Sequence, residues 1–401
     1  MKSIYFEGDI LKIGLIKVLS KFSKKAYHSK VSPIKFKTFE DPKLPKEDWV
    51  RVKNIETGIC GSDMTFYTCA QGPSTAFLPI PCSKITYLGH ETVGEVVEVG
   101  SNVKNFKVGD RVCMNKYMAC CNLKGYDKQD ECEMCKAGNY ADCENYGEPS
   151  KVNIYAGAGM GDSYLAPEGQ LLSVEGLTDD EAVLIEPFAV SLHAALKRVP
   201  KEGEKVLVVG AGMIGLGLIQ FLKILQPKCK VYVMERNPNK HEFAKKLGAD
   251  EILVGEPYEA VKNATGAKMY GKGGNRMLLG GFDVIYDCVG KRTMLNDTLR
   301  WIKAQGTLVK IGYQMTKTKF DETPIWWQGL TIIGADSHGM ENYNGKKIST
   351  FEIVKDMMLK KQLITDGFIT HRFKLNDYKK AFKLLIENPK DTIKVVLECT
   401  E

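Results

Sequence analysis

The chain has 401 residues, of which 44% are apolar and 26% charged, with a net charge of +7. This composition is typical of a globular protein of about two to three domains. No apolar run reaches the roughly 18 residues that a membrane-spanning helix needs, which excludes an integral membrane protein. The N-terminal residues include acids and lack a clean apolar stretch with a cleavage site, so we expect no secretory signal and a cytoplasmic location.

Residues 12–30 hold six lysines and no acidic residue, so most of the excess positive charge lies there. We interpret this segment as a solvated insertion; the alternatives are a lid, an oligomer contact or a membrane-surface helix. The first 150 residues are rich in Gly, Pro and short β-type runs, such as 49–55 and 91–100. This pattern predicts an all-β domain.

Three residues within or just after this β-rich region carry the ligand types that zinc prefers. They are Cys60, His90 and Glu186. Each alone has an ordinary structural reading, as a small buried residue, a core histidine or a carboxylate at a helix N-terminus. Together they indicate a catalytic zinc site, which needs three protein ligands and an open position.

The twelve cysteines are too few for a disulfide scaffold. Six of them lie between residues 113 and 143, and this clustering indicates metal binding in a reducing compartment.

From Glu204 onward, apolar strands alternate with helices, which predicts a parallel sheet covered on both faces. A glycine turn follows the first of these strands and opens a helix, as in a dinucleotide-binding unit; it consists of Gly210, Ala211, Gly212, Met213, Ile214 and Gly215. Glu235 follows about 20 residues later, where a carboxylate binds ribose hydroxyls and favours NAD. Arg236 beside it leaves NADP as the alternative.

Five motifs in order resemble the zinc-dependent medium-chain dehydrogenase/reductases, the alcohol, sorbitol, threonine and glucose dehydrogenase group. They are GICGSD at 58–63, GHETVGEVVEVG at 89–100, VGDRV at 108–112, IEPFAVSLHAA at 185–195 and VVGAGMIGLG at 208–217. The resemblance implies an α/β protein with a GroES-like β-rich catalytic domain at 1–190 and 337–401. It also implies a Rossmann doubly wound NAD-binding domain at 191–336, with the active site in the cleft between them.

Carried over to this chain, the resemblance assigns Cys60, His90 and Glu186 as catalytic-zinc ligands and Glu91 as an acid that approaches the metal. Asp63 would orient the zinc-bound histidine, and Ser62 would pass the alcohol proton outward. Thr65 stands where many relatives have a histidine in that proton path. Lys240 matches a basic position near the coenzyme ribose, and Lys394 matches one near the pyrophosphate.

The resemblance further implies a structural zinc bound by four cysteines. Cys132, Cys135 and Cys143 match the last three, but the first would fall on Gln129. We expect Cys121 as the fourth ligand; Cys120 and Asp130 are the other candidates, and an unmetallated loop with free thiols is the alternative.

Together these assignments predict one catalytic and one structural zinc per chain and an NAD-linked oxidoreductase. The expected reaction interconverts a secondary alcohol of a polyol or sugar and its carbonyl. Threonine, or a larger cyclic alcohol such as a hydroxysteroid, is the alternative substrate, because the N-terminal insertion and Trp326-Trp327 could form an apolar wall.

Two other classes of protein fit less well. A catalytically inactive nucleotide-binding protein would not need every catalytic-zinc position, and a zinc-stabilised nucleic-acid binder would interleave aromatic with basic residues. We therefore expect a small-molecule alcohol or carbonyl as partner and no nucleic acid. We also expect a homodimer or homotetramer, for which the sheet edge near 324–333 is a candidate pairing surface.

Overall fold

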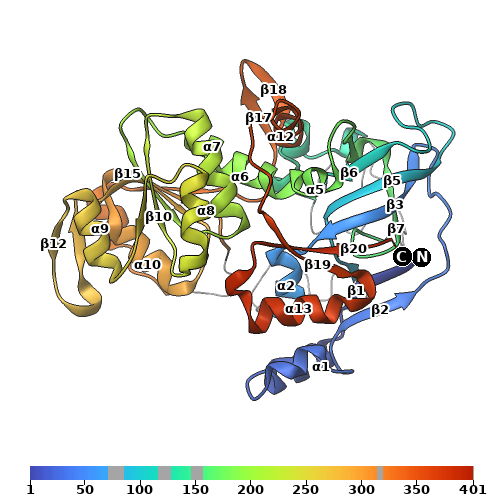
Figure 1. The fold of residues 1–401 in the computed structure, drawn as a ribbon, viewed down its shortest axis with the longest axis horizontal. Coiled ribbons are helices and arrows are strands. Elements are labelled where there is room, and N and C mark those ends of the chain that lie inside the picture. Colours follow the sequence, from blue (N-terminus) through green and yellow to red (C-terminus); the bar gives the residue numbers. More distant parts are fainter. Residues whose placement is uncertain (71–84, 116–127, 146–156, 314–318, 401) are drawn as a thin grey trace. The chain divides into compact units, whose positions relative to one another are not determined.

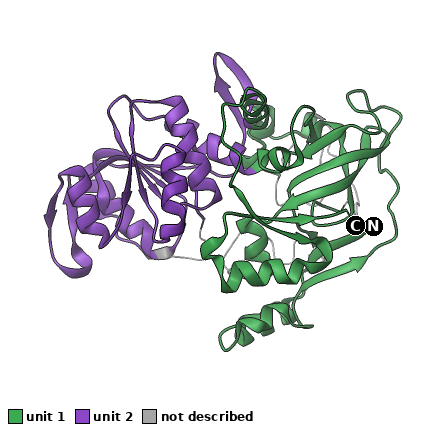
Figure 2. Cartoon of the chain, in the orientation of Figure 1, with its two compact units in different colours: residues 1–186, 351–401 green, residues 187–350 purple. Residues whose placement is uncertain are grey.

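The computed structural model describes residues 1–70, 85–115, 128–145, 157–313 and 319–400. The chain divides into two compact units, residues 1–186 with 351–401 (unit 1) and residues 187–350 (unit 2), as Figure 2 shows. The domain boundaries expected from the sequence lie after residues 190 and 336, and they stay predictions. Within the described ranges, no helix has the length and apolarity to cross a bilayer.

Unit 1 is built on a seven-stranded sheet with the order β19-β20-β3-β5-β6-β8, in which β7 also pairs with β3. Its strands are β3 Trp49–Gly58, β5 Glu91–Val99, β6 Arg111–Met114, β7 Ser163–Pro167, β8 Leu171–Ser173, β19 Ile369–Lys374 and β20 Lys394–Glu398 (Figure 1). Alternating valines of β3 and β5, among them Val50, Val52 and Val96, pack into one core. This alternation confirms the predicted β-rich character, because one face of an antiparallel sheet is buried.

A smaller antiparallel sheet in unit 1 has the order β2-β1-β4. Its strands are β1 Lys2–Glu7, β2 Ile34–Thr38 and β4 Ile85–Tyr87. The helices assigned to unit 1 are α1 Ile10–Leu19, α2 Gly61–Tyr67, α4 Glu133–Lys136, α5 Asp179–Ala182, α12 Thr350–Leu359 and α13 Tyr378–Glu387. Tyr67 of α2 stacks on Phe382 of α13 at 4.0 Å between ring centroids, which joins the two ends of the chain in one core.

Unit 2 contains a six-stranded parallel sheet with the order β11-β10-β9-β14-β15-β16. These strands are β9 Lys205–Val209, β10 Lys230–Met234, β11 Glu251–Leu253, β14 Phe282–Asp287, β15 Ile302–Lys310 and β16 Thr331–Gly334. Numbered along the chain the order is 3-2-1-4-5-6, the Rossmann order, and confirms the predicted parallel sheet. The order reverses between β9 and β14, and dinucleotides bind at the carboxyl ends of strands beside such a point.

The remaining elements of unit 2 surround this sheet or extend from it (Figure 1). The helices are α7 Met213–Leu225, α8 His241–Lys246, α9 Pro257–Thr265, α10 Arg292–Trp301 and α11 Thr323–Gln328, and α6 Ile185–Lys197 begins in unit 1. Two hairpins complete it, β12 Lys268–Tyr270 with β13 Met277–Leu279 and β17 Met340–Tyr343 with β18 Lys346–Ser349. His193 Nδ1 of α6 lies 2.6 Å from Glu341 Oε1 of β17, which ties the second hairpin to this unit.

Candidate active site

Two of the expected zinc ligands, Cys60 and His90, come together in unit 1 with Glu91, the acid expected to approach the metal. Cys60 is the N-cap of α2, His90 immediately precedes β5, and Glu91 is the first residue of β5. Their ligand atoms all lie within 4.8 Å of one another. Glu186, near the start of α6, adds a carboxylate whose Oε1 lies 3.9 Å from His90 Nε2.

A buried carboxylate connects the two loops that carry Cys60 and His90. Asp63 Oδ2 accepts a hydrogen bond from the Cys60 backbone N–H at 2.9 Å, and Oδ1 accepts one from the Gly89 N–H at 3.1 Å. Gly89 has a φ of +88°, and a Cβ there would lie 2.4 Å from the Met160 backbone nitrogen. Asp63 therefore fixes the backbone beside each ligand, while its expected role in orienting the His90 ring remains a prediction.

Glu91 forms an ion pair with Lys394 that is almost completely buried. Lys394 Nζ lies 2.7 and 2.5 Å from the two carboxylate oxygens and donates a further hydrogen bond to the Ile59 carbonyl at 3.3 Å. The side chains are 2% and 3% exposed. A Cβ on Gly58 would lie 2.1 Å from Glu91 Oε2, so glycine leaves the room that the carboxylate needs.

This ion pair is a feature that sequence reasoning missed. The sequence assigned Lys394 to the coenzyme pyrophosphate, but in the structure its amino group lies against Glu91 inside unit 1. The two residues are 303 positions apart. They meet because Gly58 of β3 pairs with Glu91 on one side and with Val396 of β20 on the other. The only sign in the sequence is a single charged residue at the start of each of two apolar strands, Glu91 in GHETVG and Lys394 in TIKVVL.

The charges around Cys60 act in opposite directions. Burial raises the pKa of the Cys60 thiol, as does the neighbouring Glu91, whereas Lys394 and a hydrogen bond from Ser62 lower it, and the net shift is upward. Burial lowers the pKa of Lys394, but attraction by Glu91 and Cys60 outweighs it and the pKa is raised. A thiol, an imidazole and carboxylates held this close form a donor set that suits zinc, whose charge favours the thiolate.

The two residues expected in the proton path lie on α2. Ser62 is half-buried next to Cys60. The Thr65 hydroxyl donates a hydrogen bond to the Gly61 carbonyl at 3.1 Å, one turn back in the same helix. Their roles in proton transfer stay predictions.

The second candidate metal site is a small lobe formed by Cys132, Cys135 and Cys143. Their sulfur atoms lie within 4.8 Å of one another, and Cys132 Sγ is 4.0 Å from Cys143 Sγ. Four sulfurs around zinc at about 2.3 Å stand about 3.8 Å apart, so this spacing fits the metal. Cys121 and the alternative Cys120 lie outside the described residues, and Asp130 ends the short 3-10 helix η2 Lys128–Asp130.

Backbone hydrogen bonds favour the thiolate of Cys132. Burial raises its pKa, but N–H groups of Cys135 and Glu144 and the side chains of Cys135 and Cys143 more than compensate, so the pKa falls to about 7. Cys132 accepts the Cys135 N–H at 3.4 Å as the N-cap of α4.

In unit 2, the glycine turn lies at the carboxyl end of β9, next to the point where the strand order reverses. Gly210 has a φ of +93°, and Gly212 caps α7, whose first residues are Met213 and Ile214. A Cβ on Gly215 would lie 1.9 Å from the Gly210 carbonyl oxygen, so only glycine permits this contact. The free N–H groups at such a helix start suit a pyrophosphate.

Glu235 follows β10 and lies against this turn. Its Oε2 accepts the Ala211 N–H at 2.9 Å and its Oε1 accepts the Asn237 N–H at 2.8 Å. Arg236 beside it is exposed, and Lys240 ends the short 3-10 helix η5 Pro238–Lys240. The structure thus brings the glycine turn and the acidic residue together, as a ribose site requires.

A second pair of charged residues at this sheet edge was not predicted. Asp287, at the end of β14, is fully buried, lies 2.5 Å from Lys310 Nζ at the end of β15, and accepts the N–H groups of Val289 and Gly290. The signal was present, because DCVG and VKIG each place a charged residue at the end of an apolar strand.

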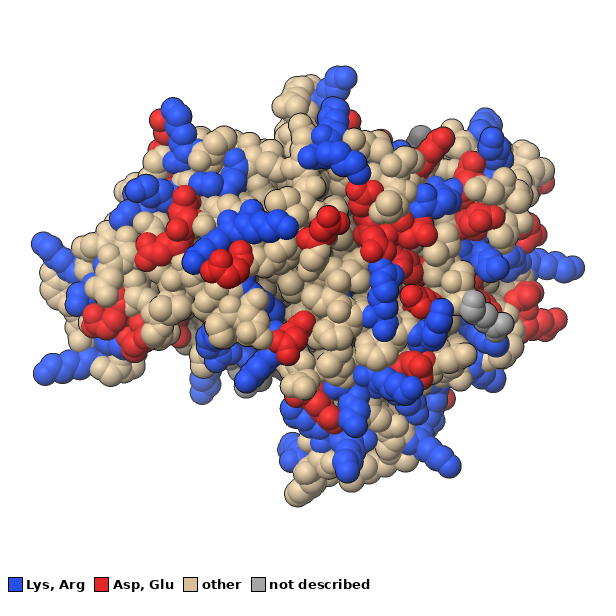
Figure 3. Space-filling model, in the orientation of Figure 1, with Lys and Arg blue, Asp and Glu red and all other residues tan. Residues whose placement is uncertain are grey.

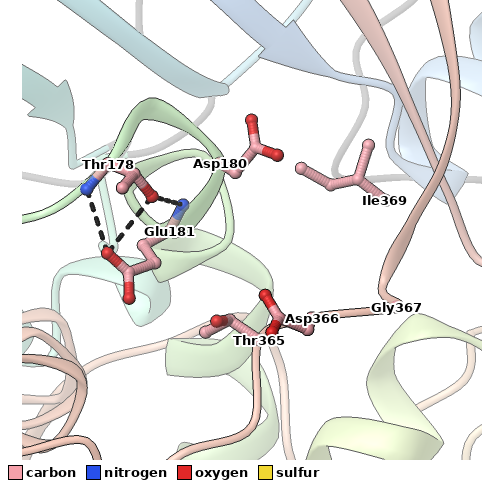
Figure 4. A pocket seen from close by; sticks show the side chains of 7 residues that line it. All are labelled: Thr178, Asp180, Glu181, Thr365, Asp366, Gly367 and Ile369. Carbon is pink, nitrogen blue, oxygen red and sulfur yellow. Dashed lines mark hydrogen bonds between the residues drawn. The ribbon is translucent and has the colours of Figure 1, made fainter.

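Two surface hollows lie away from the candidate metal and coenzyme residues. The first, about 370 Å³ in volume, is lined by Thr178, Asp180, Glu181, Thr365, Asp366, Gly367 and Ile369 (Figure 4). Three of its polar side chains already have structural partners, since Thr178 and Glu181 cap α5 reciprocally and Arg372 pairs with Asp180. The second is lined by residues between Gly274 and Asp321 in unit 2. Neither contains a candidate ligand.

Comparisons with known proteins agree with both units. Residues 46–176 match the family model of the alcohol dehydrogenase GroES-like domain, and residues 214–350 match that of the zinc-binding dehydrogenases. L-Galactonate-5-dehydrogenase of Escherichia coli K12 is 27% identical over 88% of this chain and 93% of its own length. D-Arabinitol dehydrogenase 1 of Uromyces fabae is 28% identical over 85% of this chain and 88% of its own length.

Among solved structures, that of 2R,3R-butanediol dehydrogenase from Bacillus subtilis superimposes with a TM-score of 0.70 at 26% identity. It covers 91% of this chain and 96% of its own. The matched models span both units, with the candidate zinc ligands together in unit 1 and the glycine turn beside Glu235 in unit 2. The chain therefore belongs to the zinc-dependent medium-chain dehydrogenase/reductases.

Proposed function

We propose that this protein is an NAD-linked dehydrogenase that interconverts a secondary alcohol of a polyol or sugar derivative and the corresponding ketone. The observation that carries the proposal is the close group of Cys60, His90 and Glu91, with Glu186 3.9 Å from the histidine ring. In the oxidation, the carbinol carbon loses a hydride to NAD and the hydroxyl loses a proton, which gives ketone, NADH and H⁺.

Each side chain has a distinct role in this proposal. Cys60, His90 and Glu186 would hold a zinc ion, which supplies a Lewis acid for the substrate oxygen. Ser62, adjacent to Cys60, takes the hydroxyl proton and passes it outward along α2. Asp63 keeps the Cys60 and Gly89 backbones in place through its two hydrogen bonds. Lys394 compensates the charge of Glu91, so that one buried carboxylate near the site is neutralised.

Relatives named for L-galactonate, D-arabinitol and butanediol support a polyhydroxylated substrate, whereas other relatives are named L-threonine 3-dehydrogenase and keep threonine as the second candidate. The test is reduction of NAD by the zinc-loaded protein with sugar acids, pentitols, vicinal diols, threonine and hydroxysteroids. We expect turnover with one of the first three classes. Turnover with threonine or a hydroxysteroid alone would replace the substrate class, and silence with zinc and NADH both bound would contradict the proposed reaction.

We propose NAD as the preferred coenzyme, because the Glu235 carboxylate lies at the glycine turn and would repel the 2′-phosphate of NADP. Replacing it in Glu235→Ser should raise the ratio of kcat/KM for NADP over NAD by about tenfold, a change of roughly 1.4 kcal/mol in relative binding. Arg236→Ser is the matched control and should lower that ratio. An unchanged ratio in Glu235→Ser would move the selectivity to another residue.

We further propose a cytoplasmic homodimer or homotetramer. No disulfide joins the cysteines that the structure describes, as in a reducing compartment. Strand β16 is one of the two edges of the six-stranded sheet. The neighbouring Trp326 is 82% exposed and Trp327 58% exposed, so these side chains are outside the core. A strand with an unpaired edge next to exposed apolar side chains is suited to pairing with a second copy of the chain. Sedimentation of wild type and Trp326→Ser tests it, since a monomeric wild type would contradict the assignment.

A further inference from the structure

Helix α1 and the residues after it form a surface feature of unit 1 that the dehydrogenase reaction does not use. We call residues 10–30 the N-terminal segment. The inner side of α1 packs on the core through Ile13 and Ile16. The opposite side presents Leu11, Leu15 and Val18, at the i, i+4, i+7 spacing of one helix face.

This outward face is strongly exposed. Leu11 is 85% exposed, Leu15 44% and Val18 54%, and Phe22 just beyond the helix is 85% exposed. A surface helix of a globular protein normally turns charged residues to solvent, whereas α1 is apolar on both its inner and its outer side. Packing on the core therefore explains the apolar residues on the inner side of α1 but not those on its outer side.

Lysines border the apolar face. Helical geometry places Lys12 and Lys17 on its two flanks, between the buried and the exposed side, and Lys12 is paired there with Glu7 at 2.7 Å and Asp9 at 3.5 Å. The lysines that follow α1 in the N-terminal segment are all exposed: Lys21, Lys24, Lys25 and Lys30. No acidic residue occurs from Ile10 to Phe39, and Figure 3 shows Lys and Arg side chains gathered around this part of the molecule.

Helix α13 extends the basic surface. Lys379 Nζ donates to the His28 carbonyl at 3.3 Å, and Lys24 Nζ donates to the Ile386 carbonyl at 3.3 Å, so the N-terminal segment and α13 are joined. Lys379 and Lys383 on α13 are exposed. Lysines from two separate parts of the chain thus lie close together beside the N-terminal segment.

We propose that the N-terminal segment docks on an anionic lipid surface, with the outer face of α1 and Phe22 at the boundary between headgroups and acyl chains. An apolar helix face flanked by lysines binds such a surface through apolar burial and through attraction to anionic lipids. Long lysine side chains keep their charges at the headgroups while the apolar side chains enter deeper.

A protein partner fits these residues less well. Protein interfaces are depleted in lysine and enriched in arginine, but the chain has no arginine before Arg51. A symmetric contact with a second copy would bring the same lysines against each other, because a two-fold interface pairs a patch with itself. Charge complementarity therefore favours the lipid surface.

The test is flotation of the full-length protein with vesicles of phosphatidylcholine, alone or mixed with phosphatidylserine. We expect binding to the mixed vesicles only, decreasing as salt is raised. Lys21→Glu with Lys25→Glu should weaken this binding by at least about tenfold, because two charges that attract the anionic headgroups are reversed. Lys272→Glu, an exposed lysine of unit 2, is the matched control and should bind as wild type.

A second double variant tests the exposed apolar side chains. Leu11→Ser with Phe22→Ser alters two side chains that are each 85% exposed, so folding should be unaffected. Binding should again fall at least about tenfold, since two apolar side chains no longer leave water. Val254→Ser, at 65% exposure in unit 2, is the control.

Three results would overturn the proposal. They are absence of flotation at low salt, equal binding to vesicles with and without phosphatidylserine, and wild-type binding by both double variants. Self-association that Leu11→Ser abolishes, without vesicle binding, would show that a second copy covers the face instead.

Discussion

Cys60 and Cys132 occupy the same local position, since each is the N-cap of a short helix, but their surroundings give them opposite properties. Cys60 is enclosed with carboxylates and an imidazole, and burial raises its pKa. Cys132 stands in a lobe with two other thiols, and hydrogen bonds lower its pKa to about 7.

The difference separates two uses of a metal. A mixed donor set with additional buried charge nearby is suited to a reactive metal, because one coordination position can stay open for substrate. A set of thiolates closes the coordination sphere and fastens a loop. Helix capping is shared by both sites, so burial and neighbouring residues decide the role.

The largest effect should follow removal of a ligand from the first site. His90→Ala should lower kcat/KM by more than about 100-fold, because even residues that only support a metal ligand contribute about 10- to 100-fold. NADH binding, measured by fluorescence titration, should stay near wild type and zinc analysis should show one ion lost. Loss of NADH binding as well would indicate misfolding and would contradict the assigned role.

Breaking the buried ion pair should be the next largest effect. Lys394→Met leaves the Glu91 carboxylate unpaired and should lower the free energy of unfolding by about 3–5 kcal/mol, measured by urea denaturation. Adding Glu91→Gln should restore much of this loss. Lys374→Met breaks an exposed pair with Glu398 on the neighbouring strands and should change stability by less than about 1 kcal/mol. Equal losses of unfolding free energy in Lys394→Met and Lys374→Met would show that burial does not strengthen the contribution of the Glu91–Lys394 pair.

Removing a thiol from the lobe should affect stability more than turnover. Cys143→Ser should lower the melting temperature by roughly 4–8 °C, if the lobe contributes about 2 kcal/mol. One zinc ion should be lost, while kcat at room temperature stays close to wild type. A fall in kcat as large as that of His90→Ala would abolish the distinction between the two sites.

The smallest effect is a difference in thiol chemistry in the metal-free protein. Because the pKa of Cys132 is lowered from 9.0 to about 7, its thiolate is stabilised above that value, and this stabilisation disappears as the pH falls through about 7. Alkylation at neutral pH, followed by mass spectrometry, should therefore modify Cys132 before Cys60. Cys132→Ser identifies the peptide, and preferential modification of Cys60 would reverse the comparison.

Local patterns in the sequence were sufficient for the architecture. The glycine turn predicts a strand-to-helix corner because Gly210 and Gly215 meet conformational and packing demands that only glycine satisfies. The apolar strands after Glu204 predict a parallel sheet because both faces are buried. The side chains of Cys60, His90 and Glu186 likewise indicate a zinc site, because thiolate, imidazole and carboxylate groups are the ligands that zinc prefers.

Contacts between distant parts of the chain could not be predicted in the same way. The partner of Lys394 depends on the register of β3 with β5 and β20, and a shift of one residue would turn its side chain to the other face. The tryptophans at 326 and 327 carry no sign in the sequence of whether they face the core or solvent.

The sequence by itself therefore determined the chemical types of the donors, the coenzyme turn and the alternation of strands and helices, because each depends on residues close together or on one residue's chemistry. Tertiary structure alone decided which charges meet and which apolar side of α1 remains in water. Those outcomes depend on strand register and on packing between segments hundreds of residues apart, and no local pattern records them.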